Sequence, residues 1–205
     1  MSSEEELKQV AAEVATCVEC RLHHSRKIAV PGEGPADADL MFIGEGPGFH
    51  ENEQGRPFVG AAGRFLEELL ASIGLQREDV FIGNVVKCRP PGNRDPQKDE
   101  IDACAKYLER QIQAINPKVI VTLGRFSMAR YFSGERISAI HGQARVVNQR
   151  LIVPMYHPAA ALHQPSLRQV VKDDFSRLPD MIAKGESVLP SDDAPSIDAE
   201  QLNLF

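Results

Sequence analysis

The chain has 205 residues, of which 42% are hydrophobic, and this size and composition suit one globular domain. No apolar run reaches the roughly 18 residues that a membrane-spanning helix needs. The N-terminal sequence Met-Ser-Ser-Glu-Glu-Glu is acidic, whereas a secretory signal peptide begins with basic residues. We therefore expect a cytoplasmic, monomeric protein with no membrane partner.

The net charge of −6 is unevenly distributed along the chain. Residues 185–205 contain five acidic residues and no Lys or Arg, and residues 1–13 contain four acidic residues and one Lys. The part between these ends is therefore mildly basic. The negative total does not exclude nucleic-acid binding, and a centre this weakly basic does not establish it.

Hydrophobic spacing predicts helices that alternate with short buried strands. In chain order it predicts a helix over residues 6–17, a strand over 40–43, a helix over 61–73, a strand over 80–86, a helix over 99–115, a strand over 119–123, a short helix over 125–132, a strand over 151–155 and a helix over 166–184. This alternation favours an α/β fold, namely a three-layer αβα sandwich with a central four-stranded, mainly parallel sheet.

The same pattern predicts where the chemistry and the domain boundary lie. Ligands of such sheets bind beyond the carboxyl ends of the strands, so the chemistry is expected in residues 45–48, 84–89, 124–125 and 156–162. Residues 185–199 are rich in Ser, Pro and Asp and have little to bury. We expect residues 1–184 to form the domain and residues 185–205 to form a disordered acidic tail.

The chain has four cysteines, Cys17, Cys20, Cys88 and Cys104. The first two form a C-x2-C motif, and fifteen residues separate the other two. Disulfides are uncommon in cytosolic enzymes, so four thiols favour a zinc ion or an iron–sulfur cluster. The spacing does not distinguish these two metals, and unlinked buried cysteines are the third alternative.

The glycine-rich segment at 44–48 follows a predicted strand. It lacks the dinucleotide-binding fingerprint G-x-G-x-x-G, and Pro47 removes a backbone donor that a phosphate would need. No phosphate-binding Gly-Lys-Ser/Thr motif occurs either. The segment is therefore expected to be a tight turn that brings backbone close to a ligand, with Glu45 beside it.

Three motifs, in order along the chain, resemble the signatures of the family-4 uracil-DNA glycosylases. They are G-E-G-P-G at 44–48 followed by G-R-P-F-V-G at 55–60, then G-N-V-V-K-C-R-P-P-G-N-R-D-P at 83–96, and H-P-A-A-A-L at 157–162. The four cysteines match that family's ligands for a [4Fe–4S] cluster in order and spacing. The resemblance covers residues 14–180. It implies an enzyme that hydrolyses the N-glycosidic bond of uracil in DNA, leaving an abasic site for base excision repair.

For three residues the resemblance implies contact with a uracil flipped out of the DNA stack. Phe58 matches the aromatic residue that stacks on the base, Asn84 the residue that recognises its edge, and His157 the histidine that faces uracil O2. The Asn amide pairs with uracil O4 and N3–H, whereas cytosine presents the reverse pattern. A donor from His157 would stabilise the negative charge of the departing uracil.

The resemblance places four further residues around the base. Glu51 matches the acidic residue near uracil C5, where its bulk would exclude the methyl group of thymine. Glu45 and Gly46 match the turn beside the attacked sugar carbon, and Glu45 is the candidate for orienting the water. Leu162 lies in the loop expected to enter the duplex. Taken alone, each of these residues and the three above has an ordinary explanation as a loop, capping or core residue.

Two features differ from the family pattern or its relatives. Phe49 and His50 occupy a stretch that is often acidic in the family. Residues 91–96 lack the histidine-containing basic insertion of a related branch that bonds covalently to DNA, which favours turnover over capture. The alternatives are a non-catalytic or covalently capturing uracil-DNA sensor and a zinc-stabilised nucleic-acid-binding module.

Two groups of side chains have no single assignment. The basic residues near the cysteines either contact phosphates or offset the charge of a cluster; they are Arg21, Arg26, Lys27, Lys87, Arg89 and Arg94. The remaining histidines are given no site role; they are His23, His24, His50, His141 and His163.

The last five residues, Gln201-Leu202-Asn203-Leu204-Phe205, resemble the Q-L-[SD]-L-F peptide with which bacterial proteins bind the β sliding clamp. In this interpretation Leu204 and Phe205 enter an apolar pocket and Gln201 is a polar anchor. The tail would then tether the enzyme to DNA that is being replicated or repaired. The alternative is that the peptide folds back onto the domain.

Overall fold

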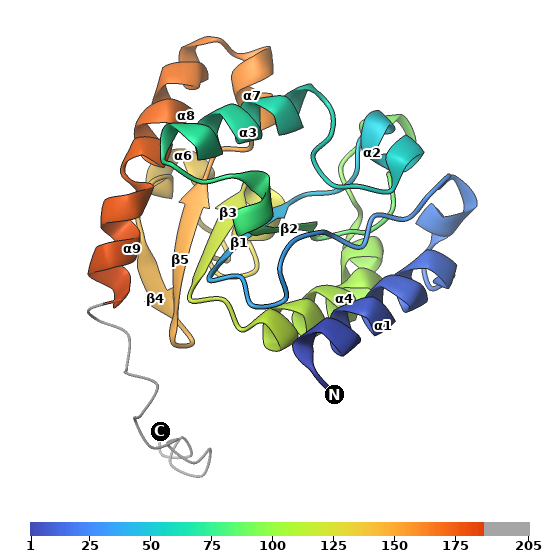
Figure 1. Cartoon of the computed structure of the whole chain (residues 1–205). Helices are drawn as coiled ribbons and strands as arrows, with labels where there is room; N and C mark the ends of the chain where they lie inside the picture. The colour runs from blue at the N-terminus through green and yellow to red at the C-terminus, as the bar shows by residue number, and fades with distance from the viewer. Residues whose placement is uncertain (187–205) are drawn as a thin grey trace, which may run out of the picture.

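The computed structural model describes residues 1–186 of the chain. Its centre is a five-stranded sheet with the order β2-β1-β3-β5-β4. The strands are β1 (Leu40–Gly44), β2 (Phe81–Asn84), β3 (Val119–Leu123), β4 (Arg145–Val147) and β5 (Arg150–Met155). Helices cover both faces of this sheet (Figure 1). The prediction of a three-layer α/β fold is therefore confirmed.

The four predicted strands are mutually parallel, and the fifth strand, β4, was not predicted. It is a short edge strand that runs antiparallel to β5, and its residues are exposed or half-buried. An edge strand of this kind has no apolar run, so hydrophobic spacing gives no signal for it. The predicted strand over 80–86 was too long. The chain bends after Asn84, where the backbone N–H groups of Val85 and Val86 donate to the carbonyl groups of Gly44 and Glu45. The burial of both side chains in the core explains their apolar character.

The first face of the sheet is covered by α1 (Ser3–Thr16) and α4 (Lys98–Ile115). Val14 and Leu108 from these helices belong to one core cluster with Met41 and Ile43 of β1. Arg110 of α4 also forms ion pairs with two acidic residues of α1, Glu6 and Glu13. The N-terminal helix is thereby held against the domain.

The second face is covered by α3 (Ala61–Ser72), α7 (Pro158–His163), α8 (Ser166–Ser176) and α9 (Leu178–Glu186). Phe65 of α3 and Phe175 of α8 belong to one core cluster with Phe42 of β1. Because side chains alternate along a strand, Phe42 faces these helices while Met41 and Ile43 face the others. The predicted helix over 166–184 is divided in two, because Pro179 cannot donate within a helix and its ring clashes with the preceding turn.

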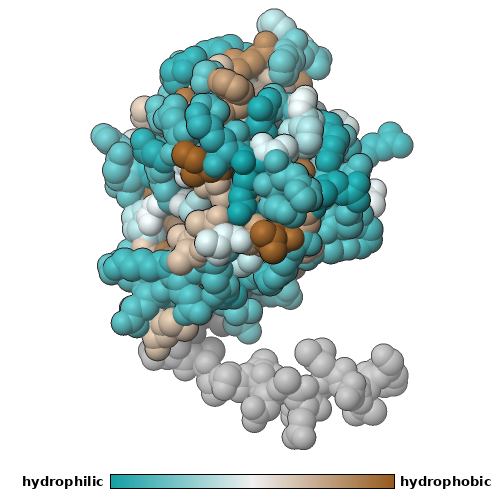
Figure 2. Space-filling view, turned by 90° about the vertical axis from the view of Figure 1, so that its right-hand side faces the viewer, coloured by the Kyte–Doolittle hydropathy of each residue, from teal (hydrophilic) through white to brown (hydrophobic). Residues whose placement is uncertain are grey.

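The connecting segments contain shorter helices. They are α2 (Phe49–Gln54), α5 (Arg125–Met128) and α6 (Ile137–Ile140), with 3-10 turns at η1 (Arg21–His24), η2 (Arg77–Asp79) and η3 (Pro91–Asn93). The predicted helix over 125–132 was therefore too long. The side of the molecule that carries α2 is mostly hydrophilic, with small separate hydrophobic patches (Figure 2).

None of the helices within residues 1–186 is long and apolar enough to cross a membrane. The predicted linker and clamp-binding peptide lie outside the described residues.

Candidate active site and cysteine pocket

A cleft of about 300 Å³ opens where β1, β2 and β5 end. The predicted residues that line it are Glu45, Gly46, Glu51, Phe58, Asn84 and His157. Leu162 does not line the cleft. It lies on α7, with 40% of its surface exposed, next to His163, which does line it.

Asn84 is the last residue of β2 and is paired in register with Gly44 of β1. Asn84 is 2% exposed, and its Oδ1 atom has no hydrogen-bond partner among residues 1–186. A Cβ atom at Gly44 would lie 2.5 Å from this oxygen and 2.8 Å from the Phe58 ring, so glycine is needed for the close approach. A buried acceptor without a partner costs about 1–3 kcal/mol, and a ligand N–H would remove that cost.

Phe58 adopts a φ of 52°, in the left-handed region that bulky residues rarely occupy. Arg77 holds this conformation, because its Nη1 donates to the Phe58 carbonyl at 3.0 Å and its other nitrogen donates to the Pro57 carbonyl. A Cβ atom at Gly63 would lie 1.8 Å from the Phe58 oxygen, so helix α3 can approach this closely only with glycine there. The ring of Phe58 is thereby fixed at the wall of the cleft.

Glu51 closes the loop that carries Phe58. Its carboxylate accepts hydrogen bonds from the backbone N–H groups of Gly48, Val59 and Gly60, at 3.1, 2.8 and 2.9 Å. These bonds join α2 to the start of α3 on either side of Phe58. Glu51 thus has a positioning function that the sequence motifs did not reveal, and its predicted place beside uracil C5 stays a prediction.

His157 caps α7, since its Nδ1 accepts the N–H of Ala159 at 3.1 Å. Its ring stacks against Phe58, with 5.4 Å between centroids and 22° between planes. Burial lowers the pKa of His157 to about 4, and the charge of Glu51 opposes this only partly. The imidazole is therefore neutral at pH 7. Because Nδ1 is the acceptor, the proton lies on Nε2 and can be donated to a ligand.

Glu45 follows β1 and is half-buried in the cleft. Burial raises the pKa of its carboxyl group, the negative charge of Asp95 raises it further, and Arg125 opposes both effects. An ion pair between Asp95 and Arg125 lies nearby. Glu45 is thus an acid in the cleft whose proton affinity is increased by burial and by a neighbouring carboxylate.

Eight further residues line the cleft. Pro47, Gly48 and Ala159 lie within the segments where the chemistry was expected, whereas Ala62, Pro90, Asn93, Arg94 and His163 lie outside them. Arg94 is engaged by the buried carboxylate of Glu100, with two bonds of 2.9 and 2.6 Å. Arg94 and Asn93 lie inside the motif at 83–96, and His163 follows the motif at 157–162 by one residue. Those positions were the available signal, and His163 was given no role.

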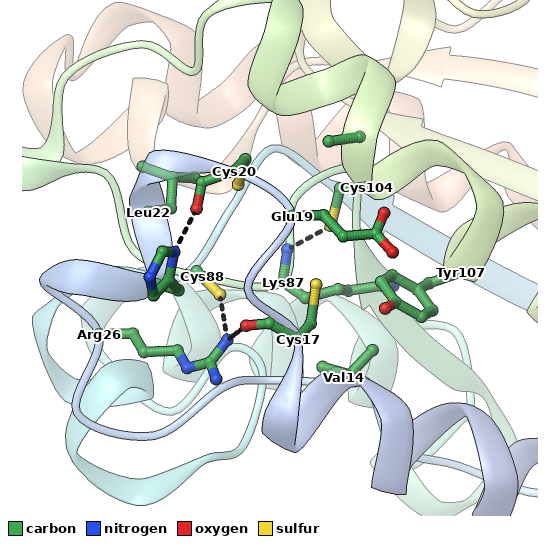
Figure 3. Close-up of a pocket in the computed structure, with 12 residues that line it drawn as sticks. Val14, Cys17, Glu19, Cys20, Leu22, Arg26, Lys87, Cys88, Cys104 and Tyr107 are labelled. Carbon is green, nitrogen blue, oxygen red and sulfur yellow. Dashed lines mark hydrogen bonds between the residues drawn. The ribbon is translucent and has the colours of Figure 1, made fainter.

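The four cysteines line a second pocket (Figure 3). Cys17 caps the end of α1, Cys20 precedes η1, Cys88 lies in the segment after β2, and Cys104 belongs to α4. Their thiols are free rather than joined in disulfides. Cysteines far apart in the sequence are thereby gathered at one place.

Two N–H groups point at sulfur atoms in this pocket. Arg26 Nη1 lies 3.6 Å from Cys88 Sγ, and the backbone N–H of Lys87 lies 3.2 Å from Cys104 Sγ. Burial raises the pKa of Cys20 and Cys88, and raises that of Cys104 to about 11, so these three thiols would be neutral without a ligand. Within residues 1–186, no group of three or more His, Cys, Asp or Glu side chains is arranged to hold a single metal ion.

Lys87 lies between the two sites. Its side chain is buried, and its Nζ donates to the Asn84 carbonyl at 3.0 Å and to Gln111 Oε1 at 2.6 Å. Burial lowers the pKa of this amine to about 8. One five-residue segment, 84–88, thus contributes a lining residue to the cleft, this buried link and a cysteine to the pocket.

Comparison with known proteins identifies the family. The model of the uracil DNA glycosylase superfamily matches residues 31–177. The type-4 uracil-DNA glycosylase of Sulfurisphaera tokodaii is 50% identical over 182 residues, which is 84% of this chain and 83% of the relative. Those of Archaeoglobus fulgidus and Thermotoga maritima are 43% and 42% identical, each over 90% of this chain and 98% and 99% of the relative. The chain therefore belongs to the type-4 uracil-DNA glycosylases of the uracil DNA glycosylase superfamily.

Proposed function

We propose that the protein excises uracil from DNA by hydrolysing the N-glycosidic bond, which leaves an abasic site and starts base excision repair. Family membership supports this reaction. The observation that carries it in the molecule is the unpaired Oδ1 of Asn84, buried in the same cleft as a neutral His157. Asn84 Oδ1 is available to accept an N–H of the base, and the Nε2–H of His157 is available to donate to it.

Base recognition is assigned to Asn84 and Phe58. The Oδ1 atom of Asn84 would accept uracil N3–H, and its amide N–H would be donated to O4. Cytosine would leave both groups unpaired, at a cost of about 1–3 kcal/mol each. The rings of Phe58 and His157 contact one another, so the base stacks against Phe58 rather than entering between them. The carboxylate of Glu51, fixed by three backbone hydrogen bonds, would exclude the methyl group of thymine sterically.

Bond cleavage is assigned to His157 and Glu45. As the glycosidic bond breaks, the sugar acquires oxocarbenium character and uracil acquires negative charge. The Nε2–H of His157 donates to O2 and stabilises that charge, and the neutral imidazole makes this bond while its Nδ1 still accepts the N–H of Ala159. Glu45 orients the water that attacks C1′, and Gly46 leaves room for the sugar beside it.

The cysteine pocket is proposed to hold a [4Fe–4S] cluster through Cys17, Cys20, Cys88 and Cys104. The pocket suits such a group, because four thiols, apolar walls and N–H donors aimed at sulfur occur together. When bound, the cluster would supply iron–sulfur bonds that fasten α1, the segment after β2 and α4 to one another. The residues of the cleft carry out excision.

The substrate is DNA. The residues proposed to bind uracil and to cleave its bond line one cleft, which favours an enzyme that turns over rather than a non-catalytic sensor. We propose that residues 1–184 form the catalytic domain and that the protein is a cytoplasmic monomer. The free cysteines support a reducing compartment. Leu162, exposed on α7, is proposed to enter duplex DNA beside the flipped base.

The C-terminal peptide is proposed to bind the β sliding clamp through Gln201, Leu202, Leu204 and Phe205. Support comes from its sequence alone, since it lies outside the described residues. Deleting residues 201–205 is expected to abolish binding to purified clamp in a pull-down and to leave excision from a short oligonucleotide unchanged. Undiminished clamp binding after the deletion would contradict this assignment.

The proposed reaction is tested with a labelled single-stranded oligonucleotide that contains one uracil. One half of each sample is heated in alkali, which breaks the strand at abasic sites, and the other half is run on a denaturing protein gel. We expect alkali-dependent breaks with many turnovers for each enzyme molecule, and none with a thymine control. DNA that stays bound or covalently attached without breaks would instead support the sensor.

A further inference from the structure

Within residues 1–186, six large hydrophobic side chains are exposed, and two of them flank the cleft. Leu162 is next to His163, and Phe49 is next to Gly48; both neighbours line the cleft. Phe49 is 53% exposed at the start of α2. A single exposed aromatic residue is ordinary, so its contacts decide whether it has a function.

Phe49 is paired with a cation. The guanidinium of Arg89 lies over its ring, 5.4 Å from the centroid. The Nε of Arg89 donates to Asn93 Oδ1 at 2.7 Å, and Asn93 lines the cleft. His50 packs edge-on against the same ring, with 5.5 Å between centroids. The ring and the guanidinium are therefore held beside the opening of the uracil cleft.

The other basic residues near the cysteines have partners within the fold. Arg21, Lys27 and Arg94 form ion pairs with Asp99, Glu53 and Glu100, respectively. Arg26 donates to the Cys17 carbonyl and to Cys88 Sγ, and Lys87 is buried. Arg26 and Lys87 form no salt bridge within the described part of the chain, but the first is bonded to two cysteines and the second is buried. Arg89 forms no salt bridge there either, and its hydrogen-bond partner Asn93 is neutral, so its positive charge is available to a phosphate.

We propose that Phe49 and Arg89 form a nucleotide subsite beside the uracil cleft. The Phe49 ring stacks on an unpaired base adjacent to the uracil in the same strand, and Arg89 contacts the phosphate beside that base. The proposal rests on the proposed function and deepens it by naming single-stranded DNA as the substrate that uses the subsite. Stacking on an aromatic ring accepts any base, so the subsite adds affinity without adding sequence preference.

The choice of single-stranded DNA follows from what each substrate exposes. When uracil leaves the stack of a single strand, its neighbour loses a stacking partner and has no paired base to hold it. In a duplex the same neighbour stays paired and stacked on its other side, and is not available to Phe49. The subsite therefore contributes more to excision from single strands than from duplexes.

The test is a cycle of protein and substrate changes. The substrates are single-stranded oligonucleotides with one uracil and with a tetrahydrofuran abasic analogue on its 5′ side, on its 3′ side or on neither. The proteins are the wild type, Phe49→Ala, Phe49→Trp and Arg89→Ala. Val146→Ala, at an exposed residue on β4, and Arg136→Ala, at an exposed arginine, are the matched controls.

We expect Phe49→Ala to raise KM about 30-fold on the unmodified strand, the middle of the range for one base–aromatic stack. One of the two abasic analogues should raise the KM of the wild type by a similar factor and leave the KM of Phe49→Ala unchanged. Phe49→Trp should behave as the wild type. Arg89→Ala should raise KM. It should also reduce the slope of log KM against log salt concentration by about the amount expected for one phosphate contact. The effects of Phe49→Ala should shrink on duplex DNA, and the two control variants should match the wild type.

The subsite would be overturned if every abasic-flanked substrate raised the KM of the wild type and of Phe49→Ala by the same factor. It would also be overturned if Phe49→Ala had the KM of the wild type on the unmodified strand. The same cycle is run as binding, by fluorescence anisotropy. If the wild type released no uracil, the proposed function would fail while the anisotropy cycle still decided whether Phe49 stacks on the flanking base.

Discussion

The cleft and the cysteine pocket differ in how their polar groups are used. In the cleft, Asn84 Oδ1 has no hydrogen-bond partner in the part of the chain that the structure describes, and the Nε2–H of His157 remains available because Nδ1 caps a helix. In the pocket, Arg26 and Lys87 direct their N–H groups at sulfur or backbone of the protein itself. The cleft thus has donor and acceptor groups that are available to a ligand, whereas the donors of the pocket bond to the protein itself and stabilise the fold. Substitutions in the first should alter catalysis, and substitutions in the second should first alter stability.

The largest effect is expected at His157. His157→Asn retains a side-chain acceptor for the cap of α7, since Asn is a favoured N-cap residue, but it is too short to donate to uracil O2. We expect kcat to fall about 100- to 1000-fold, as for the loss of one donor to a developing anion. Single-turnover excision rates and thermal melts measure the two effects.

The comparison variant is His157→Ala, which also removes the cap. It should lose a similar amount of activity and, in addition, about 1 kcal/mol of stability, or roughly 2–4 °C in Tm. A kcat for His157→Asn within threefold of the wild type would exclude the histidine as the donor.

The next effect is expected in the pocket. Cys104→Ser removes one thiol from α4, and the loss of bound iron would release the link between α4 and the N-terminal segment. By analogy with the removal of a disulfide, we expect a cost of about 2–5 kcal/mol, or a fall in Tm of roughly 10 °C. Iron content, visible absorbance and melting are measured on the same sample. Ser25→Ala, beside η1 but outside the cysteine set, is the control.

If Cys104→Ser kept its iron and its Tm, the pocket would not be the cluster site. If the wild type contained no iron and Cys104→Ser contained zinc, the pocket would belong to a zinc protein.

The smallest effect is expected from pH. The folded pKa of His157 is about 4, below the 6.5 of an unperturbed histidine, so the unfolded chain binds the extra proton between these values. This contribution to stability is complete above pH 6.5 and is lost as the pH falls towards 4, by at most about 3 kcal/mol. Urea unfolding of the wild type and His157→Asn across pH 4–7 measures it. Parallel curves for the two proteins would contradict the lowered pKa.

Much of the fold was predictable because its strands are buried on both faces. Residues 119–123 form β3 as predicted, since a strand covered by helices on either side is an uninterrupted apolar run. The half-exposed β4 has no such run, and Pro179 divides a helix whose apolar spacing continues across it. Local pattern therefore located the interior of the sheet and missed its edge.

Much of the cleft was predictable as well. Glu45, Gly46 and His157 follow strands that end at one edge of the sheet, and Asn84 is the last residue of such a strand. The resemblance of the motifs added Glu51 and Phe58. What spacing cannot express is contact between side chains and backbone far apart in the chain. The three bonds of Glu51 and the hold of Arg77 on Phe58 depend on the folded loop. The neutral state of His157 depends on its burial, and the ring pair of Phe49 and Arg89 on the meeting of two loops.

The most direct test of the difference between the two regions is Asn84→Ala, measured for activity and stability together. Removing a buried acceptor that has no partner should leave Tm unchanged or raise it slightly. The kcat/KM for uracil should fall about 5- to 150-fold, and the preference for uracil over cytosine should narrow. A lowered Tm with unchanged kcat/KM would show that Asn84 serves the fold, and would contradict its assignment as the residue that recognises uracil.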